Sequence, residues 1–141
     1  GIELARRGAT VVGVDLDPGM LDTARRKAPD LTWVEADLST LDLGGRAGTP
    51  TAFDVVVAAG NVMIFLAPGT EAATIARLAA HVVPGGALVA GFQLTHAAYG
   101  LERYDADCSA AGLVLAERWA TWDRQPWVPG GDYAVSVHRR P

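Results

Sequence analysis

Short apolar runs alternate with helical patterns along most of the chain. Each apolar run is a few residues long and is bounded by Gly, Pro or Asp, which is typical of a buried strand. The pattern predicts strands at residues 9–15, 31–37, 53–60, 87–94, 113–122 and 132–140. It predicts helices at residues 17–28, 69–83 and 101–112, and residues 1–7 have the pattern of the last two turns of another helix.

Capping residues mark where these helices begin and end. Asp17 followed by Pro18 predicts an N-cap with proline at the first helical position. Gly8 is expected as the C′ residue of the first helix, and Gly112 is expected to close the last one. The Pro-Gly-Gly run at 84–86 is expected to end the helix at 69–83.

The order of the elements predicts the fold class. Strands and helices alternate through most of the chain, and two strands joined by the loop 123–131 follow at the end. This order predicts an α/β fold, with a mostly parallel sheet covered by helices on both faces and an antiparallel C-terminal edge hairpin. No linker or repeat divides the sequence, so residues 1–141 are expected to form a single domain.

Composition narrows the classes of partner. The formal net charge is −4 and half of the 141 residues are apolar, which disfavours non-specific binding to nucleic acid or to an anionic membrane. No run reaches the roughly 18 apolar residues of a membrane-spanning helix. The single cysteine, Cys108, excludes a disulfide within the chain and favours the reducing cytoplasm.

Asp15 stands where the strand at 9–15 ends. In open α/β sheets, ligands bind outside the carboxyl ends of the strands. A carboxylate there can accept hydrogen bonds from both hydroxyls of a ribose, so Asp15 indicates a nucleoside ligand. Asp17 has a local task as a helix cap. The alternative for Asp15 is a solvated side chain that begins a turn.

A ribose-binding acid of this kind is expected to follow a Gly-rich phosphate-binding loop by about 20 residues. Counting back from Asp15 places that loop before Gly1. We therefore expect the chain to be truncated before or within the helix that follows the loop. The first strand of the sheet is expected to be absent with it, from a position between the strands at 9–15 and 53–60.

Four segments carry a family resemblance in the right order and spacing. They are GATVVGVDLDPGMLDTARRKAP, VEADLSTLDL, FDVVVAAGNVMIFL and HVVPGGALVAGF. Together with the terminal hairpin they resemble the class I S-adenosylmethionine-dependent methyltransferases, which have a three-layer Rossmann-like sheet. The resemblance covers nearly the whole chain, although a Gly-x-Gly-x-Gly loop is absent and Val stands at a usual Leu. The resemblance implies that S-adenosylmethionine is the cofactor. It also implies that residues 1–141 are part of an enzyme and are inactive by themselves.

The resemblance also implies roles for residues on the adenosine side. Asp15 would hold the ribose diol, and Leu16 would pack on the adenine. Asp37 would accept from the adenine amino group, and the Leu38 N–H would donate to a ring nitrogen. The alternative for Asp37 is an Asx turn toward the next residues. Met20 is a further adenine contact or, equally, a core residue of its helix.

Other residues are implied for the methionine end of the cofactor and for the acceptor. Ala59, Gly60 and Asn61 would lie along the methionine end, with Asn61 alternatively a turn residue. The acceptor is expected to be a small molecule that binds at the same edge of the sheet. The residues expected around it are Phe65, His96, Tyr99, Trp122 and Trp127. The alternatives are packing against a helix for Trp122 and a structural role in the hairpin for Trp127. Trp119 is expected to pack internally.

The catalytic residues stay unknown from the sequence, and no metal-ligand spacing is present. His96 follows the strand at 87–94 on the ligand side and is a candidate general base, but an exposed loop histidine is the favoured alternative. His81 falls late in a helix and His138 near the far end of the last strand, so neither is expected to act as a base. A nicotinamide-dependent dehydrogenase is an alternative of the same fold, but the only lysine is Lys27 and a Tyr-x-x-x-Lys pair is missing. A non-catalytic nucleoside-binding domain is the other alternative. The oligomeric state cannot be read from the sequence.

Overall fold

The computed structural model describes residues 1–95 and 99–141, in two compact units. Unit 1 is Gly1–Thr51 and unit 2 is Ala52–Pro141. The two are treated separately below, and the expected single domain stays a prediction. His96, the candidate base, lies outside the described residues. Within the described part, no helix is long and apolar enough to cross a membrane.

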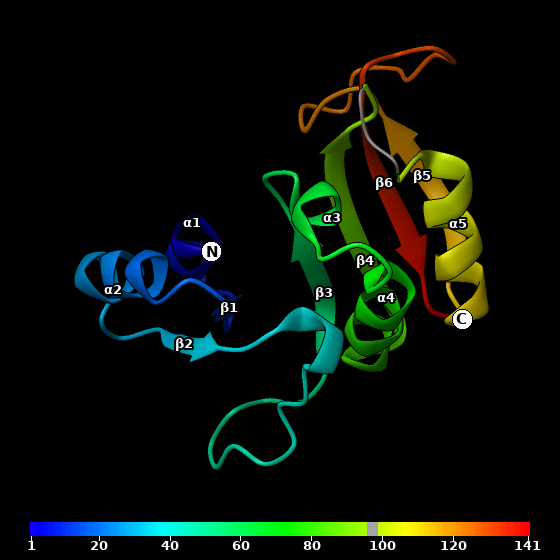
Figure 1. The fold of residues 1–141 in the computed structure, drawn as a ribbon. Helices are drawn as coiled ribbons and strands as arrows, with labels where there is room; N and C mark the ends of the chain where they lie inside the picture. The colour runs from blue at the N-terminus through cyan, green and yellow to red at the C-terminus, as the bar shows by residue number, and fades with distance from the viewer. Residues whose placement is uncertain (96–98) are drawn as a thin grey trace. The chain divides into compact units, whose positions relative to one another are not determined.

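Unit 1 is built on a parallel pair of short strands. Its elements are α1 (Ile2–Arg6), β1 (Val12–Asp15), α2 (Pro18–Lys27), β2 (Thr32–Glu35) and the 3₁₀ turn η1 (Leu38–Thr40). β1 and β2 run in the same direction, with Val12 opposite Thr32 and Asp15 opposite Glu35. The helix α2 connects them (Figure 1), as a parallel pair requires.

The helix ends of unit 1 follow the predicted capping chemistry. Gly8 has φ 91°, and its N–H donates to the Ala5 carbonyl at 2.9 Å. The Ala9 N–H donates to the Leu4 carbonyl at 3.1 Å, which completes a Schellman motif. At the start of α2, Oδ1 of Asp17 accepts from the backbone N–H of Gly19 at 2.7 Å.

Unit 2 contains a four-stranded sheet in the order β3-β4-β6-β5 (Figure 1). Its elements are β3 (Phe53–Ala58), α3 (Val62–Phe65), α4 (Glu71–Ala80), β4 (Val82–Gln93), α5 (Leu101–Ala110), β5 (Val114–Trp119) and β6 (Tyr133–Arg139). β3 and β4 are parallel, and β6 is antiparallel to both β4 and β5. The mostly parallel α/β sheet with an antiparallel C-terminal hairpin is confirmed.

The Pro-Gly-Gly run at 84–86 was expected to end a helix, and this expectation is wrong. α4 ends at Ala80, and Nδ1 of His81 lies 2.7 Å from the Arg77 carbonyl in the last turn. The run lies inside β4 as an irregularity, because Phe53 pairs with Val82 while Val55 pairs with Ala87. A Cβ atom at Gly86 would lie 2.7 Å from the Asp54 carbonyl oxygen, so glycine allows β3 to approach there.

The core of unit 2 lies between α4, α5 and one face of the sheet. Leu88, Ala90 and Phe92 alternate along β4 and each is 0% exposed. The rings of Phe92 and Tyr104 are 5.3 Å apart in an edge-to-face arrangement, and those of Tyr104 and His138 are 5.1 Å apart. These contacts attach α5 to β4 and β6.

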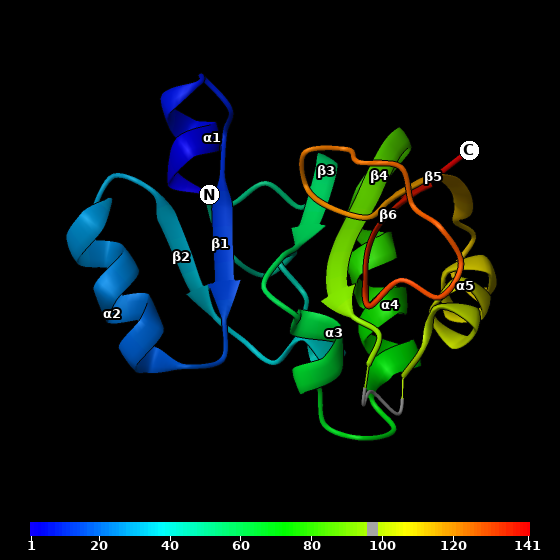
Figure 2. The ribbon, with the colours of Figure 1, turned by 90° about the horizontal axis from the view of Figure 1, so that it is seen from above.

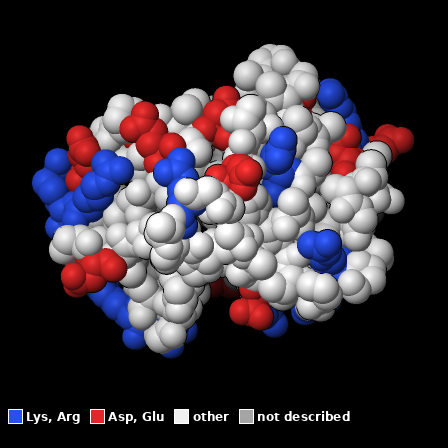
Figure 3. Space-filling view, turned by 90° about the horizontal axis from the view of Figure 1, so that it is seen from below, with Lys and Arg blue, Asp and Glu red and all other residues white. Residues whose placement is uncertain are grey.

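The opposite face of this sheet is more open near β3. Val55 is 53% exposed and Val57 is 45% exposed. Within the described residues, β3 has β4 as its one strand neighbour, and β1 has β2, so each leaves one edge without a strand partner. The strand expected between them stays a prediction. On the face drawn in Figure 3, acidic and basic side chains are interspersed.

A partly buried polar cluster joins α5 to β5 and β6. Nη2 of Arg118 lies 2.6 Å from Oδ1 of Asp105, and Nε donates to Oγ of Ser136 at 2.9 Å. Nε2 of His138 lies 3.1 Å from the same Asp105 oxygen, and His138 is 1% exposed. Burial lowers the pKa of His138, although the Asp105 carboxylate acts in the opposite direction.

We expect this histidine to make the protein sensitive to acid. The folded state holds His138 neutral below the ordinary histidine pKa of about 6.5, so the unfolded chain binds the extra proton more readily. The free energy of unfolding should therefore fall as pH drops below about 6.5. Urea unfolding at several pH values should show a smaller fall in His138→Asn than in the parent protein. Equal pH dependence in the two would contradict this role.

Cys108 should resist alkylation in the folded protein. It lies on α5 at 0% exposure, and burial raises the pKa of its thiol to about 12. Because the thiolate is the reactive form, little nucleophile exists at neutral pH. Iodoacetamide should label Cys108 only after denaturant is added, as read by mass spectrometry. Rapid labelling in buffer alone would show that α5 opens readily.

Candidate functional site

The carboxyl ends of β1 and β2 bring the adenosine-side candidates of unit 1 to one edge. Asp15 is the last residue of β1, and Asp37 follows the end of β2 by two residues. The Ala36 N–H donates to the Asp15 carbonyl at 3.0 Å, which continues the strand pairing to this point. The two carboxylates therefore belong to neighbouring strand ends, as the sequence predicts.

One carboxylate oxygen of Asp15 has a local structural role, and the other is free to accept a hydrogen bond. Its Oδ1 accepts from the backbone N–H of Asp17 at 2.9 Å, so the turn-forming alternative is also realised. The residue is partly exposed, and Oδ2 accepts no hydrogen bond from the described residues. One oxygen therefore shapes the turn into α2, and the other is available to a ligand.

Asp37 repeats this arrangement. Its Oδ1 accepts from the backbone N–H of Ser39 at 2.8 Å and from the Ser39 hydroxyl at 2.7 Å. These two hydrogen bonds hold the pKa of the Asp37 carboxyl below its ordinary value, and the bond from the hydroxyl has the larger effect. The Asx turn is thus present, and Oδ2 is free of partners in the described structure.

Two exposed apolar side chains accompany these acids. Leu16 is 63% exposed and Met20 is 61% exposed. The alternative of Met20 as a helix core residue is therefore wrong, because the buried residue of α2 is Leu21. Leu38 begins η1, and the first N–H groups of a helical turn have no partner within it, so the Leu38 N–H is available as a donor.

In unit 2, Ala59, Gly60 and Asn61 turn the chain from β3 into α3. Gly60 has φ 77° and Asn61 has φ 65°, a conformation that favours Gly and Asn. Oδ1 of Asn61 accepts from the Gln93 N–H at 3.0 Å, and its own N–H donates to the Gly91 carbonyl at 3.4 Å. Asn61 is thus a turn residue that links the carboxyl ends of β3 and β4. Its side-chain NH₂ group donates to none of the described residues.

The loop between β5 and β6 lies at the same edge of the unit 2 sheet. Tyr133, at the start of β6, pairs with Gln93, at the end of β4. Figures 1 and 2 show this loop, in orange, leaving β5 and returning to β6. The expected acceptor loop is therefore on the carboxyl-end side of β3 and β4.

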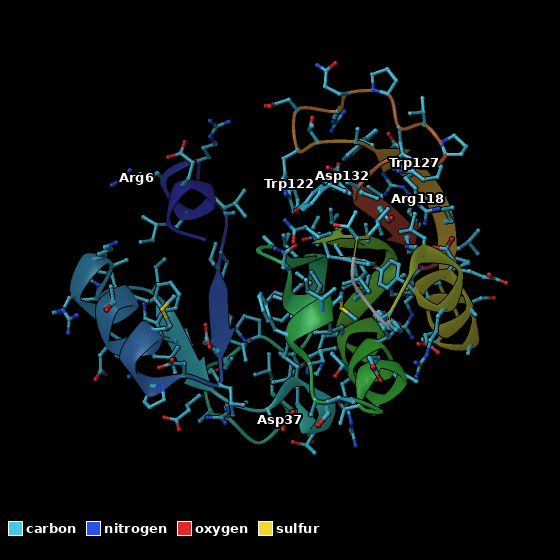
Figure 4. All side chains as sticks on the ribbon, turned by 45° about the horizontal axis from the view of Figure 1, so that its top comes forward. Arg6, Asp37, Arg118, Trp122, Trp127 and Asp132 are labelled. Carbon is cyan, nitrogen blue, oxygen red and sulfur yellow. The ribbon has the colours of Figure 1, made fainter. Side chains whose placement is uncertain are left out.

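The aromatic residues expected around the acceptor have different environments. Tyr99 is 3% exposed and its hydroxyl donates to Oδ2 of Asp107 at 2.6 Å, so it is a core residue and its assignment to an open pocket is wrong. Phe65 and Trp122 are exposed, at 77% and 44%. Trp127 is half-buried beside Arg118, whose guanidinium lies 5.6 Å from the indole centroid (Figure 4).

Among the described residues, no histidine is placed to act as a general base. His81 and His138 are buried, and His138 pairs with Leu88 in the middle of the sheet. The described part of the chain also holds no group of three or more His, Cys, Asp or Glu residues suited to a metal. The candidate site thus offers acceptors, donors and apolar surface for binding, while the catalytic residues stay unassigned.

Sequence reasoning did not find how Gly91 positions Trp122. A Cβ atom at Gly91 would lie 2.5 Å from Cζ2 of the Trp122 indole, so the indole occupies the space above that glycine. Gly13 has the same relation to Trp33 in unit 1. A glycine inside a strand does indicate a close approach, but it does not reveal the partner.

Known proteins give an independent view of the chain. A family model described as a methyltransferase domain matches residues 1–86. The fold is similar to that of a TehB-like SAM-dependent methyltransferase from Corynebacterium glutamicum, with a TM-score of 0.89 and 31% identity over 99% of this chain and 72% of that one. No curated protein matches.

Two further solved structures show the same fold at lower identity. The CcbJ methyltransferase from Streptomyces caelestis is 21% identical, with a TM-score of 0.85 over 99% of this chain and 78% of that one. SAM-bound CalS10, an amino pentose methyltransferase from Micromonospora echinaspora, is 21% identical, with a TM-score of 0.73 over 95% and 76%. Since the family model matches more than half of the residues and the Corynebacterium protein is 31% identical over nearly the whole chain, this protein belongs to the S-adenosylmethionine-dependent methyltransferases.

Proposed function

We propose that the protein transfers a methyl group from S-adenosylmethionine to a small-molecule acceptor. The observation that carries the proposal is the pair of aspartates in unit 1. Asp15 and Asp37 each use one carboxylate oxygen for a turn and leave the other free at neighbouring strand ends. Family membership sets aside the dehydrogenase alternative and favours an enzyme over a passive nucleoside-binding domain.

The residues of unit 1 fit the adenosine part of the cofactor. Asp15 Oδ2 would accept from the ribose hydroxyls, and the exposed Leu16 would cover one face of the adenine. Asp37 Oδ2 would accept from the adenine amino group, and the Leu38 N–H would donate to a ring nitrogen. The lowered pKa of Asp37 suits this role, because an ionised carboxylate is an acceptor only.

In unit 2, Ala59, Gly60 and Asn61 are proposed to lie along the methionine end. Ala59 and Gly60 are exposed, so a ligand can approach their backbone closely. The Asn61 NH₂ group is free to donate, because its Oδ1 is already used by Gln93. Asn61 can therefore form the turn through its side-chain oxygen and still bind a ligand through its NH₂ group.

The cofactor supplies the electrophilic methyl group when it is bound. The residues of this chain would mainly orient it, since methyl transfer needs the nucleophile, methyl and sulfur in line. A small-molecule acceptor agrees with the amino pentose and magnesium protoporphyrin IX named for two proteins of this fold, of which the second is 20% identical. A cytoplasmic location stays a prediction that rests on the lone Cys108.

The role of Asp15 can be separated from its turn. In the full-length protein, Asp15→Asn keeps an oxygen for the Asp17 N–H but removes the charge offered to the ribose. Hydrogen bonds to charged groups contribute about 1.5–3 kcal/mol each, so S-adenosylmethionine should bind at least about tenfold more weakly. Titration calorimetry measures this affinity.

Asp17→Ala is the matched control for Asp15. It removes the cap of α2 and should lower the free energy of unfolding by about 1 kcal/mol, with little change in affinity. Unchanged cofactor affinity in Asp15→Asn would remove Asp15 from the site. If the parent protein binds no S-adenosylmethionine at all, the proposed function itself fails.

Asn61 should contribute to the free energy of unfolding through its side-chain hydrogen bond and through its tolerance of a positive φ. Asn61→Ala loses the bond to Gln93 and places alanine at φ 65°, which should cost about 1–3 kcal/mol of unfolding free energy. Asn61→Gly loses the same bond but tolerates this φ, so it should cost less. Urea denaturation compares the two. Equal stability of both variants and the parent would show that the turn does not depend on Asn61.

A further inference from the structure

Trp122 presents an indole that is fixed in orientation yet accessible. Its Nε1 donates to the Tyr133 hydroxyl at 3.1 Å, which fixes the ring against the start of β6. The residue is nevertheless 44% exposed. A large aromatic ring held by a hydrogen bond and still open to solvent can serve as a binding surface.

Gly91 determines where this ring lies. A Cβ atom at Gly91 would be 2.5 Å from Cζ2 and 2.9 Å from Cε2 of the indole, and 2.7 Å from the Tyr133 hydroxyl. Trp122 and Tyr133 therefore both occupy the space that any other side chain at this position would fill. The indole is held directly over the backbone of β4 at Gly91.

Gly91 is also next to the segment proposed to hold the methionine end. Its carbonyl accepts from the Asn61 N–H at 3.4 Å. Ala58 pairs with Ala90, so the chain leaves β3 at Ala59 beside Gly91. The accessible indole and the proposed methionine segment thus share one residue of β4 within the same unit.

Two arginines of the hairpin, Arg118 and Arg124, are directed at groups other than Trp122. The Arg124 guanidinium lies 4.7 Å from the Trp119 ring centroid, and Arg118 is bonded to Asp105 at 2.6 Å. Among the described residues, no Lys or Arg lies over Trp122. Its aromatic face is therefore open to a cation supplied by a ligand. Figure 4 shows Trp122 apart from Trp127 and Arg118.

We propose that the indole of Trp122 contacts the positively charged sulfonium of S-adenosylmethionine through a cation–π interaction. The inference rests on the proposed function, because it needs the methionine end at Ala59–Asn61. The sulfonium is the one group that distinguishes the methyl donor from its product, since S-adenosylhomocysteine carries a neutral thioether. An aromatic face attracts the first and not the second. Trp122 thus favours binding of S-adenosylmethionine over binding of S-adenosylhomocysteine.

The test compares charged and neutral ligands in the full-length protein. S-adenosylmethionine, the amine analogue sinefungin and S-adenosylhomocysteine are titrated by calorimetry into the parent, Trp122→Leu and Trp122→Phe. Leu keeps apolar bulk without a π face, so the preference for the two cationic ligands over S-adenosylhomocysteine should fall by about three- to tenfold. Phe, a weaker cation–π partner, should give an intermediate loss.

Two further variants complete the test, one as a negative control and one that displaces the Trp122 ring without removing it. Trp119→Leu removes an indole from the same hairpin whose face already carries Arg124, and it should leave the preference unchanged. Gly91→Ala keeps Trp122 but displaces its ring, and it should lower the preference as Trp122→Leu does. Circular dichroism checks that each variant is folded, and Trp122→Phe carries the test if the others are not.

An unchanged preference in Trp122→Leu and Trp122→Phe would overturn the proposal. So would an equal weakening of all three ligands, which would make Trp122 a general packing residue. A rise in the KM for the acceptor with an unchanged ligand preference would also overturn it, since Trp122 would then belong to the acceptor pocket. Failure of the parent to bind any of the three ligands would instead refute the proposed function.

Discussion

The arrangement of unit 2 depends on β4 being hydrogen-bonded along both of its edges. β3 pairs with it in parallel and β6 in antiparallel orientation, so its backbone is satisfied without solvent. One face of β4 carries Leu88, Ala90 and Phe92 against the helices. The end of the same strand offers Gly91 and Gln93 to the residues that leave β3. A shift of β4 by one residue would exchange its two faces and separate the candidate residues from their supports.

The local chemistry of the sequence predicted much of the fold. Asp17 before Pro18 and the glycines at 8 and 112 stop or start helices through backbone conformations that depend on few other residues. The Pro-Gly-Gly run was misassigned because its position inside β4 depends on the approach of β3, which no local pattern contains. Tyr99 was misassigned for a similar reason. Its burial requires Phe92 and Tyr104, which reach it only through the pairing of β4 and the packing of α5.

The candidate site shows that local and ligand-binding roles do not exclude each other. A carboxylate has two oxygens, and both Asp15 and Asp37 use one of them to form the turn that presents the other. The sequence predicts both residues at strand ends, but it leaves a role in the turn and a role in ligand binding as alternatives. The Asn61 amide divides its oxygen and its nitrogen in the same way. Short polar side chains at strand ends can therefore orient themselves for binding without further support.

The four tryptophans are distributed unequally between the units. Trp33 is in unit 1, with its Nε1 bonded to the Ala28 carbonyl at 2.9 Å, and Trp119, Trp122 and Trp127 are all in or beside one hairpin of unit 2. Intrinsic fluorescence therefore contains one signal from unit 1 and a separate group of signals from the hairpin. Replacing the hairpin tryptophans would leave Trp33 as a reporter of unit 1, and replacing Trp33 would leave a reporter of unit 2. The emission of such variants would show, without any added dye, whether the two halves of the chain lose their structure together or in sequence.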